Sequence, residues 1–146
     1  MPDIRALSDS FAVAPQIALA EIGAVKAAGF GFIVNNRPDG EAFDQPTGAD
    51  MEAAALEAGL GYLAIPVDHS GFTVEQVSAL AALMVSARPI LAYCRSGTRS
   101  AMLWALASAA RGADIEGIID KAMTAGYDVR GVRPAMEQLS AQAQGT

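Results

Sequence analysis

Residues 90–101 read Ile-Leu-Ala-Tyr-Cys-Arg-Ser-Gly-Thr-Arg-Ser-Ala, and this stretch decides which fold the sequence predicts. Its first part, Ile90–Cys94, is continuously apolar, as is typical of a strand that is buried on both faces of a parallel sheet. A short polar loop follows, and the chain becomes apolar again from about Ser100 to Ala110, which predicts a helix. A buried strand, a loop and a helix in this order form the repeating unit of α/β proteins.

Outward from this stretch, strand-like and helix-like runs alternate along the chain. Thr73 and Gln76 form a capping box that predicts a helix start, and Thr47 followed by Asp50 predicts another. The expected strands are 11–14, 30–34, 62–67 and 90–94. The expected helices are 18–28, 47–58, 73 to a stop at Pro89, 100–110, 114–125 and 132–142. This alternation predicts a three-layer α/β sandwich, in which helices flank a central, mainly parallel sheet of about four to five strands.

The composition favours one folded domain over residues 1–146. Hydrophobic residues make up 52% of the chain and charged residues 18%, which excludes a disordered protein. The net charge is −6, and an acidic surface repels a phosphate backbone, so we expect no nucleic-acid partner. One cysteine and one histidine cannot build a thiolate or imidazole metal site, so we expect neither a metal nor a cofactor.

The start of the chain and the length of its apolar runs indicate the cellular location of the protein. The first five residues, Met-Pro-Asp-Ile-Arg, lack the basic and then apolar layout of a signal peptide. The longest apolar run, around residues 102–110, is shorter than the ~18 residues that a membrane span needs. We therefore expect a cytoplasmic protein without membrane association.

The loop between the last expected strand and its helix has the features of an anion site. Such a turn aims several backbone N–H groups at one point, where the helix dipole adds positive charge. Gly97 allows a backbone conformation that a side chain would oppose, and Arg99 can donate two hydrogen bonds in one plane to an oxyanion. We therefore expect the loop to bind an anionic small molecule or a phosphorylated substrate. The loop residues expected to contact this anion are Arg95, Ser96, Gly97, Thr98 and Arg99.

Cys94 lies at the strand end of this loop, where the same positive field favours the thiolate form of its side chain. Ser100 follows Arg99 and could donate a hydrogen bond to the sulfur, which would stabilise it as a leaving group. The alternative is an inert core cysteine, because a free cysteine at the end of an apolar strand is often buried and unreactive. Two arginines, one glycine and three hydroxyl residues in the next six positions favour a reactive Cys94.

Two other polar loops are expected at the same edge of the sheet, and they hold the supporting candidates. Asp68 is the first candidate for a general acid, and a solvated turn aspartate is an equally good interpretation. Asp39 is a second candidate acid, although a role in fixing its own turn is favoured. Arg37 could help to bind the anion, although a structural role beside neighbouring carbonyls or Asp39 is favoured. Arg95 is expected to point outward, and His69 is interpreted as a solvated loop residue rather than a base.

At these residues the sequence resembles the phosphatase-like domain of the beta-lactamase hydrolase-like proteins, which are small bacterial relatives of the dual-specificity phosphatases. The resemblance covers nearly the whole chain and is carried by four segments. These are 11–16, 34–41, 64–67 and 92–100. The resemblance implies a cysteine-phosphatase sandwich fold, with Cys94 as the nucleophile, Arg99 as the phosphate-binding arginine and an aspartate on the preceding loop as the general acid.

The spacing within the loop departs from the pattern of the cysteine phosphatases. Those enzymes place five residues between nucleophile and arginine, whereas four stand between Cys94 and Arg99. The shorter spacing is similar to the loop of rhodanese sulfurtransferases.

Three hypotheses therefore stay open. The first is a phosphatase that forms a phosphocysteine on Cys94 and uses Asp68 as acid and then as base. The second is a sulfurtransferase that carries a persulfide on Cys94, and the third is a non-catalytic anion-binding module.

Overall fold

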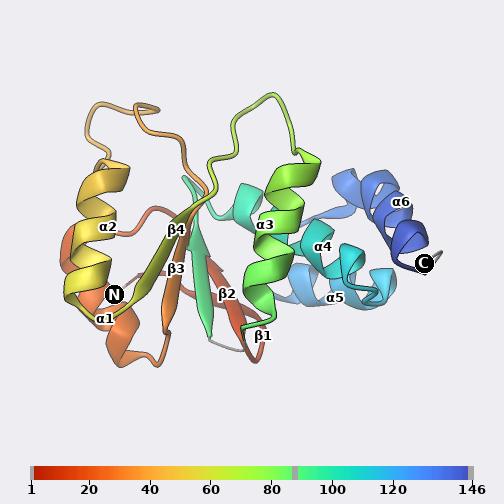
Figure 1. Cartoon of the computed structure of the whole chain (residues 1–146), viewed down its shortest axis with the longest axis horizontal. Coiled ribbons are helices and arrows are strands. Elements are labelled where there is room, and N and C mark those ends of the chain that lie inside the picture. The colour runs from red at the N-terminus through yellow and green to blue at the C-terminus, as the bar shows by residue number, and fades with distance from the viewer. Residues whose placement is uncertain (1, 87–88, 145–146) are drawn as a thin grey trace.

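The strands form one sheet in the computed structural model, which describes residues 2–86 and 89–144. The strands are β1 Arg5–Ser8, β2 Phe11–Ala14, β3 Phe32–Asn35, β4 Gly61–Ala64 and β5 Ile90–Tyr93. Their order across the sheet is β1-β2-β5-β3-β4 (Figure 1). All neighbours pair in parallel except β1, which is antiparallel to β2. The carboxyl ends of β2, β5, β3 and β4 therefore point to one edge of the sheet, which lies below the two long loops at the top of Figure 1.

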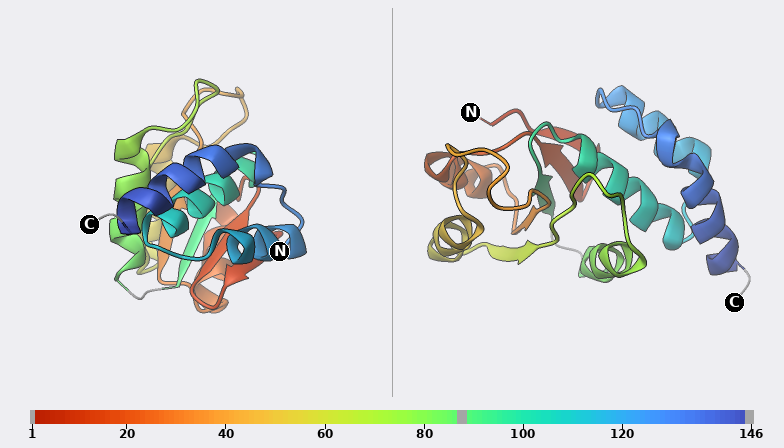
Figure 2. Two further views of the ribbon diagram at one scale, coloured as in Figure 1. Left: turned by 90° about the vertical axis from the view of Figure 1, so that its right-hand side faces the viewer. Right: turned by 90° about the horizontal axis from the view of Figure 1, so that it is seen from above.

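Helices cover both faces of this sheet. The helices are α1 Ile22–Ala27, α2 Gly48–Glu57, α3 Val74–Met84, α4 Thr98–Ala110, α5 Ile115–Thr124 and α6 Arg133–Gln144. The pair α1 and α2 lies on one side of the strands, and α3 and α4 lie on the other (Figure 1). Helix α6 packs on α4 from the side away from the sheet (Figure 2), and α5 contacts α4, α6 and β1. Within the described residues, no helix combines the length and the apolar character that a membrane crossing needs.

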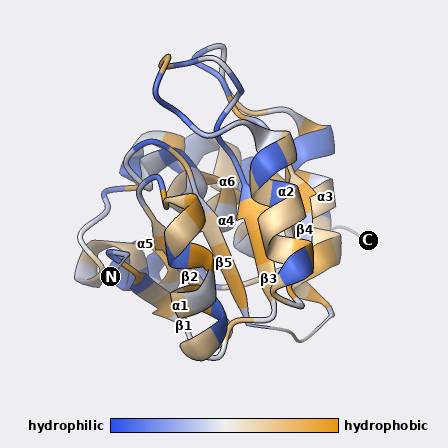
Figure 3. Cartoon of the chain, turned by 90° about the vertical axis from the view of Figure 1, so that its left-hand side faces the viewer, coloured by the Kyte–Doolittle hydropathy of each residue, from blue (hydrophilic) through white to orange (hydrophobic). Residues whose placement is uncertain are grey.

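Two apolar cores fill the spaces between the layers. The smaller core joins α1 and α2 to the sheet, and residues such as Val25, Ile33 and Met51 are fully buried there. The larger core joins the other face of the sheet to α3, α4, α5 and α6. Nine of the thirteen residues of helix α4 are buried. The helix is apolar on nearly all sides, which is typical of a helix that other elements enclose. Figure 3 shows the resulting contrast between hydrophobic strands and hydrophilic loops above the carboxyl edge of the sheet.

The fold confirms the predicted α/β sandwich and its capped helices. The Thr47 hydroxyl oxygen accepts a hydrogen bond from the Asp50 amide at 3.1 Å at the start of α2. At the start of α3, the Thr73 hydroxyl accepts from the Gln76 amide at 3.1 Å and the Gln76 side chain accepts from the Thr73 amide at 2.8 Å. These side chains satisfy N–H groups that have no partner within their own helix.

The structure differs from the predicted elements in several places. The strand expected over 30–34 is shifted to Phe32–Asn35, and the helix expected over 18–28 begins with a 3₁₀ turn at Leu19–Glu21. Strand β1 was not expected, because only Leu7 among its four residues is buried. The strand expected over 62–67 ends at Ala64, two residues before Pro66, whose nitrogen cannot donate to a ladder. Helix α3 ends at Met84 rather than running to Pro89, and residues 87–88 of that expected helix lie outside the described residues.

Candidate active site

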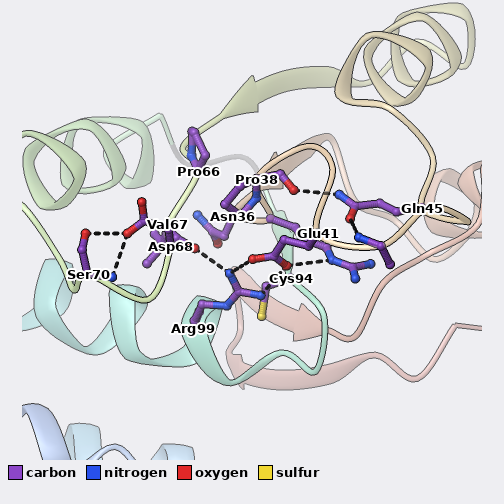
Figure 4. A network of polar contacts seen from close by, with 12 residues as sticks. Asn36, Pro38, Glu41, Gln45, Pro66, Val67, Asp68, Ser70, Cys94 and Arg99 are labelled. Atoms are coloured by element: carbon purple, nitrogen blue, oxygen red, sulfur yellow. Dashed lines mark hydrogen bonds and ion pairs between the residues drawn. The ribbon is translucent and has the colours of Figure 1, made fainter.

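The candidate site lies where the chain leaves β5, β3 and β4 at one edge of the sheet. Cys94 follows β5, Asn36 follows β3, and Val67 with Asp68 follows β4 after a short extension (Figure 4). The three strands are neighbours in the order β5-β3-β4, so their parallel pairing brings these loops together. The loops that the sequence predicted at a common sheet edge therefore do meet.

Asn36 is fully buried and joins these segments through every polar group that it has. Its amide donates to the Tyr93 carbonyl at 2.8 Å, and its carbonyl accepts from the Val67 amide at 2.9 Å. Its side-chain nitrogen donates to the Ile65 carbonyl at 2.9 Å, and its side-chain oxygen accepts from the Ser100 hydroxyl at 2.8 Å. A buried amide side chain needs such partners, and here they fix the loop after β4 and the first turn of α4 relative to the sheet.

The Cys94 sulfur lies beneath the loop that opens α4, and its side chain is fully buried. The Gly97 amide donates to the Cys94 Sγ at 3.1 Å. Gly97 has φ +94°, a left-handed conformation that suits glycine and turns the loop back over the sulfur. Figure 4 shows the Arg99 guanidinium beside this sulfur. The sulfur thus lies next to a main-chain donor and a cation.

Arg99 is held by two groups besides the sulfur. Its two terminal nitrogens donate to the Glu41 carboxylate at 2.8 and 2.9 Å, and one of them also donates to the Val67 carbonyl at 2.6 Å. The hydrogen bond to Glu41 raises the pKa of Arg99, burial opposes this, and the nearby Cys94 adds to it. The guanidinium therefore links the Cys94 loop to the loops that follow β3 and β4.

Glu41 is shared between two arginines. The Arg37 Nε donates to the Glu41 carboxylate at 3.0 Å, next to the Arg99 contacts. The hydrogen bond from Arg99 lowers the pKa of Glu41 to about 2, against burial, and Arg37 adds to the effect. Arg37 also donates to the Gln16 side chain at 3.0 Å, and the Gln16 amide donates to the Arg95 carbonyl at 3.2 Å. These bonds connect the end of β2 to the same cluster.

Asp68 is exposed and is not among the residues that line the pocket formed by Glu41, His69, Arg95 and Arg99. Its carboxylate accepts from the Ser70 amide at 2.8 Å and from the Ser70 hydroxyl. These two bonds lower the pKa of Asp68, with His69 and Arg99 adding smaller attractions. The neighbouring Val67 carbonyl is bound to Arg99, so the backbone of this loop is tied to the Cys94 side of the site.

A polar pocket of about 290 Å³ opens at this cluster. It is lined by Glu41, His69, Arg95 and Arg99, so three of its four side chains carry or can carry positive charge. Arg95 is exposed, as expected from the sequence, and reaches this pocket, whereas the buried Cys94 is not part of the lining. Another cavity of about 220 Å³ lies between α3, α4 and α6 and has no charged side chain in its lining. The charges that line the pocket of Glu41, His69, Arg95 and Arg99 suit an anion.

The contacts bear on the predicted roles of Ser100, Arg37 and Asp39. The Ser100 hydroxyl donates to Asn36 rather than to the Cys94 sulfur, so the expected bond to the leaving group is wrong. Arg37 is 6% exposed and bound to Gln16 and Glu41, so it does not reach a substrate and takes the structural role, with partners other than Asp39. Asp39 accepts from the Gly48 amide at 2.7 Å and so anchors the start of α2.

The remaining loop residues bond mostly to one another. The Ser96 hydroxyl donates to the Thr98 hydroxyl oxygen at 3.1 Å and accepts from the Thr98 amide at 3.3 Å. Ser96 is exposed and Thr98 is partly buried, and Gly97 is buried beneath them. These contacts hold the four-residue turn in one shape between Cys94 and Arg99.

Sequence reasoning missed three residues that build the site. Glu41 stands in a polar segment whose composition is typical of a solvated turn, so its partial burial left no signal. Tyr127 is far along the chain, between α5 and α6, and its hydroxyl donates to the Ser96 carbonyl at 3.3 Å. A signal for Asn36 was available in principle, because two asparagines directly follow an apolar strand that ends at the predicted ligand-binding edge.

The donor set at this edge is that of an anion site. Among residues 2–86 and 89–144, no group of three or more histidine, cysteine, aspartate or glutamate side chains is arranged to hold a metal ion. The charged groups that meet at the loop are guanidiniums and one shared carboxylate. Guanidiniums are suited to bind an oxyanion, and the fully buried Cys94 sulfur lies beside that of Arg99.

Comparisons with known proteins agree with this geometry. The family model described as "Beta-lactamase hydrolase-like protein, phosphatase-like domain" matches residues 3–111. A beta-lactamase hydrolase-like protein of Agrobacterium fabrum is 34% identical over 140 residues, which are 92% of this chain and 32% of that protein. The chain thus spans about a third of the length of this relative.

Solved structures give the same picture of the fold. The structure of a candidate phosphatase from Neisseria meningitidis has 30% sequence identity and a TM-score of 0.81, and the match covers 95% of this chain and 99% of that one. Human DUSP28 has a TM-score of 0.72 at 17% identity, with 99% of this chain and 97% of that chain covered. The second likeness is one of fold alone, and it confirms the sandwich of the dual-specificity phosphatases.

Proposed function

Because the chain belongs to the family of phosphatase-like domains found in beta-lactamase hydrolase-like proteins, we propose that it is a cysteine-dependent phosphatase-like hydrolase. Its substrates would be phosphate monoesters, and its nucleophile would be the Cys94 thiolate. The single observation that carries this proposal is the position of the Cys94 sulfur, 3.1 Å from the Gly97 amide and beside the Arg99 guanidinium. A thiolate is the reactive form of cysteine, and these two donors stabilise it.

In the proposed first step, the thiolate attacks phosphorus in line with the departing oxygen. A sulfur–phosphorus bond forms, the bond between phosphorus and the ester oxygen breaks, and protonated Asp68 gives its proton to that oxygen. Arg99 and the loop amides stabilise the charge on the transferring phosphoryl group. In the second step, Asp68 takes a proton from water as the water oxygen attacks phosphorus. The sulfur–phosphorus bond breaks, and the thiolate and inorganic phosphate are released.

Substrate entry requires a rearrangement of the cluster around Arg99. Both terminal nitrogens of Arg99 already bind Glu41, and the Cys94 side chain is fully covered. A phosphate oxygen would therefore replace the Glu41 carboxylate on at least one nitrogen of Arg99 as it approaches the sulfur. The positive lining that Arg95 and His69 give to the pocket would attract the anion to this position.

A second candidate function is sulfur transfer, and the spacing of four residues between Cys94 and Arg99 favours it. The thiolate would attack the outer sulfur of thiosulfate, the sulfur–sulfur bond would break, and sulfite would leave with the bonding electron pair. The resulting persulfide would pass its outer sulfur to a nucleophile such as cyanide and return to the thiolate. Sulfite leaves readily, so this reaction would need no proton from Asp68.

One pair of assays separates the candidates. Wild-type protein and Cys94→Ser would each be given p-nitrophenyl phosphate and, separately, thiosulfate with cyanide. Phosphate release that Cys94→Ser loses supports the phosphatase, and thiocyanate formation that Cys94→Ser loses supports the sulfurtransferase. If neither product forms while inorganic phosphate or sulfate binds measurably, the chain is a non-catalytic anion-binding module and both catalytic proposals fail.

A further inference from the structure

Tyr127 reaches the Cys94 loop from a part of the chain that lies beyond the matched residues 3–111. It follows α5, and its side chain is 9% exposed. The end of α5 fixes its position, because the Tyr127 amide donates to the Ala122 carbonyl at 2.9 Å and Gly126 takes φ +97°. Arg5 donates to the Ala125 carbonyl at 3.1 Å and so ties the same turn to β1.

The hydroxyl of Tyr127 acts on the peptide unit that faces the sulfur. It donates to the Ser96 carbonyl at 3.3 Å, and that carbonyl belongs to the same peptide group as the Gly97 amide. The amide at the other end of this group donates to the Cys94 sulfur at 3.1 Å. A peptide group is planar, so fixing the direction of its carbonyl also fixes the direction of its N–H. The Tyr127–Ser96 and Gly97–Cys94 hydrogen bonds are linked through one peptide group, and hydrogen bonds linked in this way polarise one another.

The same tyrosine makes close contact with Gly97. A methyl group added at Gly97 would clash with the Tyr127 hydroxyl oxygen and lie 2.9 Å from the adjacent ring carbon. The ring therefore occupies the space where a side chain would otherwise stand, and the backbone at Gly97 comes close to it. Gly97 is needed both for its positive φ and for this approach.

We propose that Tyr127 is a positioning residue, which keeps the Ser96–Gly97 peptide turned so that its N–H points at the Cys94 sulfur. If that peptide turned over, its carbonyl oxygen would face the sulfur and oppose the thiolate. The consequence for catalysis rests on the proposed function, whereas the effect on the sulfur itself does not. Tyr127 therefore acts through the Cys94 loop and need not touch the substrate.

The charges around these groups agree with a donor role for Tyr127. Burial raises the pKa of Tyr127, an attraction to Arg5 opposes this, and Asp3 and Cys94 add to the rise. The hydroxyl therefore keeps its proton at neutral pH and can donate it to the carbonyl. Two titratable side chains from different elements interact with Cys94: Arg99 from α4 and Tyr127 from the turn after α5.

The test compares Tyr127→Phe with Tyr62→Phe. The first removes the donor and keeps the ring, and the second removes a half-buried tyrosine hydroxyl that accepts from Asn35 at 3.0 Å. Cys94 is the only cysteine, so the mass added by iodoacetamide reports on this sulfur alone. We expect Tyr127→Phe to move the pH midpoint of alkylation upward by about half a unit and to lower kcat roughly 3- to 10-fold with little change in KM. We expect Tyr62→Phe to match the wild type.

Several results would overturn the proposal. An unchanged alkylation midpoint in Tyr127→Phe would do so, whatever happens to kcat, because a merely structural role would lower activity without moving that midpoint. Equal shifts in both variants would also overturn it, because the effect would not be specific to the Ser96–Gly97 peptide. Far-ultraviolet circular dichroism of each variant checks whether it is folded before the midpoints are compared. Absence of Cys94-dependent turnover in the wild type would refute the proposed function instead, and the alkylation midpoints would still decide the role of Tyr127.

Discussion

Glu41 and Arg99 form a two-pronged ion pair, with both terminal guanidinium nitrogens 2.8 and 2.9 Å from the two carboxylate oxygens. They are 58 positions apart in the chain, so this pair joins the loop after β3 to the first turn of α4. Each side chain is largely buried, at 17% and 16% exposure. Paired geometry of this kind is directional and keeps the guanidinium plane fixed beside the Cys94 sulfur.

Because of this ion pair, the free energy of unfolding of the protein should fall as the pH becomes acidic. The pKa of Glu41 is about 2 in the folded protein against 4.5 as its ordinary value, so the stabilisation is complete above pH 4.5 and is lost as the pH falls toward 2. The shift corresponds to at most about 3 kcal/mol. We expect Glu41→Gln to lower the free energy of unfolding by roughly 2 kcal/mol at pH 7, and the difference from wild type to shrink as the pH falls through this window. Urea denaturation at a series of pH values measures this.

A matched control for this experiment is Glu57→Gln, at an exposed position on α2. It should follow the wild-type curve at every pH. The contrary result would be a free energy of unfolding of Glu41→Gln that differs from that of the wild type by the same amount at every pH between 7 and 2. In that case the carboxylate of Glu41 would not be the group that titrates.

Asp68 should matter most when the leaving group is poor. We expect Asp68→Asn to slow hydrolysis of an alkyl phosphate by about 10²- to 10⁴-fold and to slow hydrolysis of p-nitrophenyl phosphate far less, because nitrophenolate needs little help from an acid. Ser70 lowers the pKa of Asp68, so Ser70→Ala should raise it and move the basic limb of the pH–rate profile to higher pH. Initial rates over a pH series measure both effects. Equal effects of Asp68→Asn on the two substrates would remove Asp68 from the mechanism.

Gly97 should tolerate no side chain. We expect Gly97→Ala to destabilise the protein by more than about 2 kcal/mol and to abolish most activity, because alanine disfavours φ +94° and its methyl group would strike Tyr127. Thermal unfolding and phosphate release measure the two effects. Gly23→Ala in α1 is the control: nothing lies within 4 Å of the added methyl group, so it should be neutral or slightly stabilising. Wild-type activity in Gly97→Ala would contradict the described loop.

Ser100 should contribute to stability through Asn36. Ser100→Ala leaves the buried side-chain oxygen of Asn36 without its donor, which should lower the free energy of unfolding by about 1–3 kcal/mol. Ser86→Ala, at an exposed position, should cost almost nothing. Chemical denaturation of both variants is the measurement. A loss below about 0.5 kcal/mol in Ser100→Ala would show that this bond is weak.

The sequence predicted the parts of this protein that depend on local pattern. The apolar run at β5 and the caps at Thr47 and Thr73 all identify elements that the structure contains. Strand β1 escaped prediction, because a four-residue edge strand with one buried side chain has no clear alternation. Its place in the sheet comes from pairing with β2 rather than from its own residues.

The residues of the candidate site also fall into two groups: those that the local sequence indicates and those that only the fold brings together. Cys94 and Arg99 stand five positions apart in one short segment, so both could be identified as candidates directly from the sequence. Glu41 and Tyr127 reach this loop only because the sheet order and the packing of α5 bring distant segments together. The complete burial of Cys94 agrees with the core-cysteine alternative, which the apolar run before it had left open.

The central claim is that Cys94 carries the transferred group, and intact mass analysis after rapid acid quenching tests it most directly. Wild-type protein mixed with p-nitrophenyl phosphate should show the mass of one added phosphoryl group on its single cysteine, and Cys94→Ser should show none. The adduct should persist longer in Asp68→Asn, because water then lacks its base. Phosphate release without any adduct in either protein, or an added sulfur from thiosulfate with no phosphoryl adduct, would contradict the phosphatase mechanism.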